Sequence, residues 1–190
     1  PVPFNLPGHE PTVYQYTRNV DKAREELKKS KYYNDLKNYP VELSWCAEAP
    51  EEEKVALLFQ ANAAELGIHI EIRRTPFGMM IAEAQTPETT PNASVVFVAP
   101  HYAEAGSMLM TRYHSNSCGT WEQMEWIQDD NLDEMIEDAL STIDTEQRFA
   151  KYGAIQKYIV DLCPTIWLFD QAEMRAYQAD YIYWPAAATA

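Results

Sequence analysis

The fold of this chain is decided by residues 144–170, DTEQRFAKYGAIQKYIVDLCPTIWLFD. Asp144 fits the N-cap of a helix, and the apolar residues that follow recur every three or four positions and form one stripe: Phe149, Tyr152, Ile155, Ile159 and Leu162. Pro164 lacks a backbone N–H and disfavours helical geometry in the residue before it, so the helix should end near Leu162. The short apolar run 165–169 predicts a strand buried on both faces. We therefore expect a helix over 146–162 that packs on a sheet containing this strand.

Upstream, the sequence predicts a strand, a helix and a second strand in succession. Apolar and polar residues alternate at 41–46 and 68–73, as they do in half-buried strands. Residues 51–66 between them carry a helical stripe that includes Leu58 and ends at Gly67. This order predicts a β-α-β unit with parallel strands.

Weaker patterns complete the expected fold. Helices are expected at 20–29, 77–84 and 132–140, with Asn131 capping the last, and a short buried strand at 95–98. The fold class is therefore α/β, with a mixed, mostly parallel sheet flanked by helices. Residues 1–18 read as an extended lead-in segment, 19–170 as the α/β unit, and 171–190 as a tail. Residues 171–184 of this tail fit one further strand, and the last residues read as a frayed end.

Composition narrows the range of partners. A length of 190 residues fits one domain, and 46% hydrophobic residues allow a real core. The net charge of −14 argues against nucleic acid and anionic membranes as partners, because both require basic surfaces. No export signal is visible, but the chain starts at Pro1 in a loop-like stretch. It therefore reads as a piece of a longer protein, so the missing signal is uninformative.

No set of residues with catalytic spacing stands out. The chain has no GxSxG or HExxH motif and no glycine-rich phosphate loop. His114 and Ser115 lie near Cys118, and His69, His101 and His114 could ligate a metal, but neither arrangement has a recognised spacing. We expect no catalytic residue, metal or cofactor. The three cysteines, Cys46, Cys118 and Cys163, are expected to be small buried or half-buried thiols, and one disulfide among them stays open.

The irregular stretch 100–131 is the best candidate for function. Long irregular segments in compact domains are usually functional or disordered, and its aromatic content argues against disorder. Tyr102, Tyr113, Trp121 and Trp126 offer flat faces with polar handles. Such residues either line a small-molecule cleft or cap the core, and the sequence does not separate these two roles.

In order and spacing, several stretches resemble the C-terminal lobe of the bacterial extracellular solute-binding proteins of the peptide, nickel and oligosaccharide type (family 5), which serve ABC importers. These stretches are VDKAREELKKS at 20–30, ALLFQANAAELGIHIEI at 56–72, RYHSN at 112–116 and the segment 132–170. The resemblance covers about residues 20–184. It implies the type II periplasmic-binding-protein fold, in which a ligand is held between two lobes that close by a hinge.

The resemblance also implies a cellular role. The chain would capture a peptide or other small polar solute and deliver it to membrane permease subunits. Its partners would be the ligand, the permease and the N-terminal lobe of the same protein, to which the tail 171–190 would return. The location would be periplasmic or extracellular, with or without a lipid anchor on the full-length protein.

The sequence departs from this family at the peptide's amino group. Many peptide-binding members carry Asp-Tyr-Pro-Asp-Pro here, and the first aspartate holds the amino group. This chain has HYAEA at 101–105, and Val98 stands where the family has a tryptophan. The amino-group anchor is missing unless Glu104 replaces it, so an oligosaccharide, opine or metal chelate is as plausible a ligand as a peptide.

The expected ligand-binding residues lie in the loop that leaves the 95–98 strand, because ligands of open α/β sheets bind beyond the carboxyl ends of strands. They are His101, Tyr102, Glu104, Tyr113, His114, Trp121 and Trp126. Two other functions stay open: a hydrolase or transferase of small molecules, and a protein-interaction module suggested by the acidic charge and the aromatic residues.

Overall fold

The computed structural model describes residues 1–172 and 176–184. Within these residues the sheet has three strands, β1 (Val41–Cys46), β2 (Ile70–Thr75) and β3 (Ala93–Val95), in the order β2-β1-β3. Both pairings are parallel, so Leu43 of the central strand lies between Ile72 of β2 and Ala93 of β3. The predicted α/β class and the parallel β-α-β unit are confirmed.

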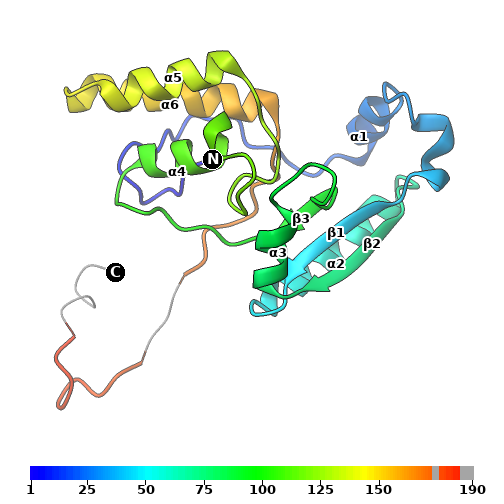
Figure 1. Ribbon diagram of the computed structural model, residues 1–190, viewed down its shortest axis with the longest axis horizontal. Coiled ribbons are helices and arrows are strands. Elements are labelled where there is room, and N and C mark those ends of the chain that lie inside the picture. The colour runs from blue at the N-terminus through cyan, green and yellow to red at the C-terminus, as the bar shows by residue number, and fades with distance from the viewer. Residues whose placement is uncertain (173–175, 185–190) are drawn as a thin grey trace.

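Helix α2 (Glu51–Ala64) connects β1 to β2 and packs on the sheet, and α3 (Phe77–Glu83) follows β2 (Figure 1). The buried face of α2 is built from Glu52, Ala56 and Ala63. Leu58, expected in the buried stripe, is 66% exposed. Residues 57–59 are all apolar, so the sequence does not show which of them faces the core. The small side chains of Ala56 and Ala63 allow the helix backbone to lie close to the sheet.

A second apolar core lies among helices α4 (Ala105–Tyr113), α5 (Asp130–Ser141) and α6 (Thr145–Leu162), which Figure 1 shows grouped beside the sheet. Asp144 caps α6 by accepting the Gln147 N–H at 2.9 Å, and α6 ends at Leu162, before Pro164, as predicted. The cap of α5 is Asp129 instead of the expected Asn131. The remaining helical segments are α1 (Val20–Leu27) and the short 3-10 helices Tyr33–Asn38 and Ser115–Ser117.

The first part of the lead-in segment lies against this helical group, whereas Arg18 at its end bonds to Asn62 and Glu65 at the end of α2. The Pro7 carbonyl accepts the Ala105 N–H at 2.8 Å, and Gln156 of α6 donates to the Gly8 carbonyl at 2.8 Å. Val2 and Val13 are buried. The lead-in segment therefore packs against α4 and α6 and contributes to the second core.

The predicted strand at 165–169 is wrong, since these residues, all described, pair with no strand. Ile166, Leu168 and Phe169 are exposed, whereas Trp167 packs against the helical core and donates a hydrogen bond to the Tyr113 hydroxyl at 3.0 Å. An apolar run can show that a segment prefers burial, but it cannot supply the neighbouring strand that a ladder requires. A strand is also missing from the described part of 171–184, and the frayed end lies outside the described residues.

Helix α4 lies inside the stretch that was expected to be irregular. Seven of its residues are buried, among them Gly106, Ser107 and Arg112, so it shows no polar face and no helical stripe. The strand expected at 95–98 lies earlier, at Ala93–Val95, and that expected at 68–73 lies at Ile70–Thr75. Cys46 and Cys118 are half-buried free thiols as expected, whereas Cys163 is an exposed one.

The close packing of α4 against its neighbours predicts a steric effect at Gly106. A methyl group at this position would meet the Tyr152 ring and Leu140, so Gly106→Ala should lower the free energy of unfolding by about 1–3 kcal/mol. Gly78 in α3 is the control, because a methyl group there meets nothing within 4 Å. Gly78→Ala should raise the stability by about 0.5–1 kcal/mol through helix propensity. Urea denaturation measures both changes, and equal effects would contradict the packing of α4.

Candidate functional site

Two pockets lie at opposite ends of the sheet. The carboxyl-end pocket, of about 180 Å³, lies just beyond the ends of all three strands, and its lining is Cys46, Ala49, Glu52, Phe77, Met80, Val96, Phe97 and Trp121. The amino-end pocket, of about 400 Å³, lies before β1 and β2 and is lined by residues 33–38 and Gly67.

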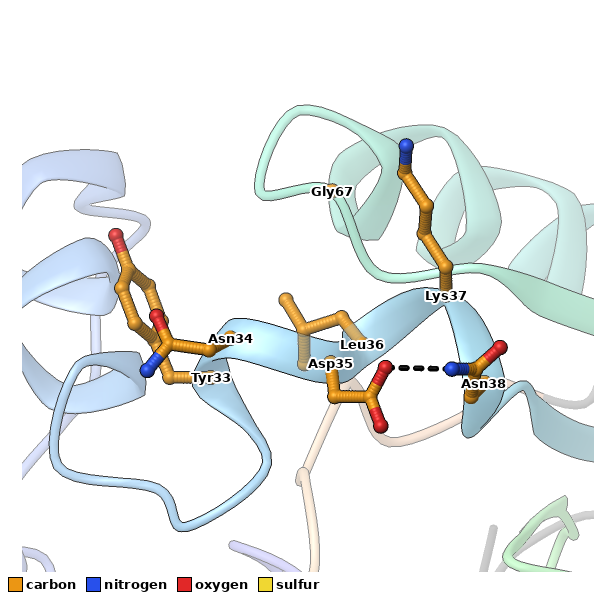
Figure 2. Close-up of a pocket in the computed structure, with 7 residues that line it drawn as sticks. All are labelled: Tyr33, Asn34, Asp35, Leu36, Lys37, Asn38 and Gly67. Atoms are coloured by element: carbon orange, nitrogen blue, oxygen red, sulfur yellow. Dashed lines mark hydrogen bonds between the residues drawn. The ribbon is translucent and has the colours of Figure 1, made fainter.

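The larger pocket is the weaker candidate. Figure 2 shows its lining as one 3-10 turn with Gly67 facing it, and Asn38 is tied to Asp35 by a hydrogen bond of 2.6 Å. This turn is mostly exposed to solvent. Ligands of open α/β sheets bind beyond the carboxyl ends of the strands. The smaller pocket stands at that edge and is therefore the candidate site.

Glu52 forms one wall of the carboxyl-end pocket and is only 2% exposed. One carboxylate oxygen accepts the Cys46 N–H at 2.7 Å, and the other accepts the Phe97 N–H at 3.2 Å. Burial, opposed by these two hydrogen bonds, raises the pKa of Glu52. The carboxylate thus joins the end of β1 to the segment that follows β3.

Three aromatic residues line the pocket together with Cys46, Ala49, Met80 and Val96. Phe77 and Trp121 meet edge to face with their ring centres 5.2 Å apart, and Phe97 contacts Phe169 in the same manner at 5.9 Å. Glu48 holds the start of α3 in place by accepting the Phe77 N–H at 2.9 Å. The pocket therefore combines flat apolar faces with one buried carboxylate.

Trp121 is the one residue of the predicted loop that lines this pocket. His101 is exposed, and its ring nitrogen Nε2 lies 3.1 Å from a carboxylate oxygen of Glu122, the residue after Trp121. The Tyr102 side chain is also exposed over about half of its surface. Its pKa is raised, first by the partial burial that remains and then by the negative charge of Glu104. Trp121 is thus joined through Glu122 to His101, which places part of the predicted loop beside the pocket.

Glu104 is occupied by partners within the chain. Arg148 of α6 donates to its two oxygens at 3.0 and 3.1 Å, and the Tyr152 hydroxyl donates to it at 2.8 Å. The hydrogen bonds from Arg148 are the main reason why the pKa of Glu104 is lowered. The pKa of Tyr152 is raised, first by burial and then by its hydrogen bond to the Glu104 carboxylate. This carboxylate joins the residue before α4 to α6 and is not free to replace the missing amino-group anchor.

Three other predicted residues lie away from the pocket. Tyr113 is buried in the helical core, which raises its pKa to about 12, and His114 is 2% exposed with Glu137 at 3.3 Å. Trp126 has a left-handed backbone, with φ of 53°, and donates to the Thr90 hydroxyl at 3.0 Å. The seven predicted residues are therefore not brought together in one place.

Glu52, Phe77 and Phe97 line the pocket although the sequence patterns did not indicate them. The signal that could have found them is the rule on carboxyl ends, which was applied only to the expected 95–98 strand. In a parallel sheet the carboxyl ends of neighbouring strands meet at one edge, so the residues after β1 and β2 belong beside those after β3.

The Glu104 network predicts a pH-dependent stability. Because the folded-state pKa of Glu104 is lowered, its contribution is fully present above the unfolded-state value, about 4.3, and is lost as the pH falls through the folded value. Glu104→Gln should therefore cost about 1.5–3 kcal/mol at pH 7, the range for hydrogen bonds to charged groups, and clearly less near pH 3. Urea denaturation across this range measures the difference. Glu134→Gln, an exposed change on α5, should cost nothing measurable, and a pH-independent cost at Glu104 would contradict the ion pair.

Comparison with known proteins gives one consistent relationship. The chain is 22% identical to the probable D,D-dipeptide-binding periplasmic protein DdpA of Escherichia coli K12. The match extends over 173 residues, which are 90% of this chain and 32% of DdpA. The ABC transporter-associated periplasmic binding protein DppA of Helicobacter pylori, solved with the peptide STSA, matches with a TM-score of 0.73 and 21% identity over 85% of this chain and 31% of DppA. The binding protein AgaA of A. tumefaciens R10, solved with agropinic acid, matches with a TM-score of 0.74 and 19% identity over 86% of this chain and 32% of AgaA.

No protein-family model matches the chain. Among residues 1–172 and 176–184, the helices all lack the length and apolar character needed to cross a bilayer. The chain spans about a third of the length of the relatives it matches. These matches confirm the resemblance found in the sequence: along most of its length the chain is similar to periplasmic solute-binding proteins of ABC transporters, and it has the fold of one lobe of that class.

Proposed function

We propose that this chain is part of the solute-binding component of an ABC importer, which captures a peptide or other small polar solute and delivers it to the membrane permease. The observation that carries this proposal is the carboxyl-end pocket, in which Trp121, Phe77 and Glu52 meet beyond the strand ends of a binding-protein fold. Flat aromatic faces with few polar groups are the usual lining of a small-molecule site.

The ligand class follows from the residues that replace the peptide anchor. His101 stands where peptide-binding relatives have an aspartate, and Glu104 is held by Arg148 and Tyr152. The structural relatives were solved with ligands as different as a peptide and agropinic acid, so the fold accepts several chemistries. A polar solute other than a plain peptide, such as an opine, an oligosaccharide or a metal chelate, fits this chain at least as well as a peptide.

The same proposal covers the organisation of the protein. Residues 19–170 would form one lobe, with 1–18 packed on it as a lead-in, and 171–190 would return to an N-terminal lobe that completes the cleft. The exposed apolar residues Ile166, Leu168 and Phe169 support this arrangement, because they lie immediately before that return. The protein would act in the periplasm or at the outer cell surface, with or without a lipid anchor, and it would bind its ligand without turnover.

Of the seven predicted ligand-binding residues, Trp121 is proposed as the direct contact and His101 and Tyr102 as neighbours at the pocket rim. His101 is held near Trp121 through Glu122, and Tyr102 follows it as an exposed ring. The buried or bonded positions of Glu104, Tyr113, His114 and Trp126 suit a supporting role for these four residues better than ligand contact.

The test is a calorimetric titration of the complete gene product with dipeptides, oligopeptides, short oligosaccharides, opines and a nickel–histidine chelate. One of these classes should bind, and Trp121→Ala should weaken that ligand at least about tenfold, or about 1.4 kcal/mol, because a stacking face is lost. Tyr33→Ala is the matched control, since it removes an aromatic ring from the amino-end pocket.

The control also separates the two pockets. Loss of affinity in Tyr33→Ala with none in Trp121→Ala would place the ligand at the amino-end pocket and overturn the proposed site. Chemical conversion of a bound solute, detected by mass spectrometry after incubation, would instead favour the hydrolase or transferase hypothesis.

A further inference from the structure

The carboxyl-end pocket holds a buried carboxyl group that pairs with no basic side chain among the described residues. Among the described residues, Glu52 forms no ion pair with a lysine, arginine or histidine, although it is 2% exposed. Its two hydrogen bonds come from neutral backbone N–H groups of Cys46 and Phe97. A buried carboxylate is costly unless it is paired, so this site lacks a counter-charge.

The residues around Glu52 also supply no counter-charge to it. None of the eight residues that line the pocket is basic. Arg73 pairs with Glu42 and Glu83, and Arg112 pairs with Glu125, whereas Arg74 lies over the Trp45 ring at 5.8 Å and its charge helps to lower the pKa of Glu48. Glu48 adds a second carboxylate beside the pocket, through its bond to the Phe77 N–H. The lining itself therefore carries one acidic side chain and no basic one.

The remaining walls suit a cation. Phe77, Phe97 and Trp121 present aromatic rings, whose faces attract ammonium and guanidinium groups. A carboxylate has about four acceptor positions, and the backbone N–H groups occupy two of those on Glu52. The other positions accept no hydrogen bond from the described residues, and Glu52 belongs to the pocket lining.

We infer that the carboxyl-end pocket is a subsite for a positively charged group of the ligand, an ammonium or guanidinium, with Glu52 as its counter-charge and Trp121 and Phe77 as its aromatic walls. This inference rests on the proposed function, which it deepens by naming the charge of the solute. The volume of about 180 Å³ is below the range of a complete small-molecule site, so the pocket takes one group of the solute. Glu52 thereby replaces, from a different element, the amino-group anchor that is missing at His101.

The experiment compares a cation with its neutral isostere. The dissociation constants of n-propylguanidinium and n-propylurea are measured on the complete gene product by ligand-observed NMR at 150 mM NaCl, which screens the general attraction of the acidic surface. n-Propylguanidinium should bind at least about tenfold more tightly than n-propylurea, a difference of about 1.4 kcal/mol. Trp121→Ala should weaken both probes, because it removes a wall that both contact.

Glu52→Gln should reduce the preference for the cation to under about threefold. Glu53→Gln is its matched control, because it makes the same change of charge one residue later on the exposed side of α2, and it should leave the preference intact. The comparison of the two probes on the unmodified protein requires no variant. It therefore tests the preference for a cation even where Glu52→Gln does not fold.

The outcomes separate this inference from the proposed function. Equal binding of the two probes, or an unchanged preference in a folded Glu52→Gln variant, overturns the cationic subsite. If a neutral solute from the titration panel binds and requires Trp121 while n-propylguanidinium does not compete with it, the inference is wrong and the proposed function stands. If no solute of the panel binds, the proposed function fails as well.

Discussion

The carboxylate of Glu52 is the point on which the sheet and the pocket both depend. It sits in the first turn of α2, where the helix dipole favours a negative charge, and it accepts the N–H groups of Cys46 and Phe97. The Ala47 N–H donates to the Thr75 carbonyl on the β2 side of β1. Because successive N–H groups of a strand point to opposite sides, the Cys46 N–H points to the side on which β3 would continue. The carboxylate takes the donors that a longer ladder would use. The sheet therefore stops at Val95, and the chain after β3 turns away to form the wall of a pocket.

A second, half-buried carboxylate organises the helical part of the chain. Glu104 stands at the N-terminus of α4 and is held by Arg148 and Tyr152 of α6, so it connects the segment after the sheet to the longest helix. The two acids show why residue type alone does not assign function. Glu104 has an arginine partner and serves the fold, whereas Glu52 lines a cavity and has no such partner among the described residues.

The predictions from the sequence succeeded where the signal is local. Strand β1 has the expected bounds, and the start and end of α6 follow from the Asp144 cap and from Pro164. The ordered motifs also indicated the family resemblance that the relatives confirm. Prediction failed where burial on several sides removes the periodicity, as in α4, and where a partner strand is required, as at 165–169. The missed pocket residues Glu52 and Phe77 come from separate elements that only the sheet brings together.

The sequence by itself thus determined the α/β class, the parallel β-α-β unit and both ends of α6, because capping, proline geometry and period depend on residues only a few positions apart. The tertiary structure alone decided which acid is paired and which stands in a cavity. Trp121 and Glu52 are far apart in the chain and meet only because the carboxyl ends of β1 and β3 share one edge of the sheet. Such long-range proximity is set by strand order and register, and no short stretch of sequence specifies either of them.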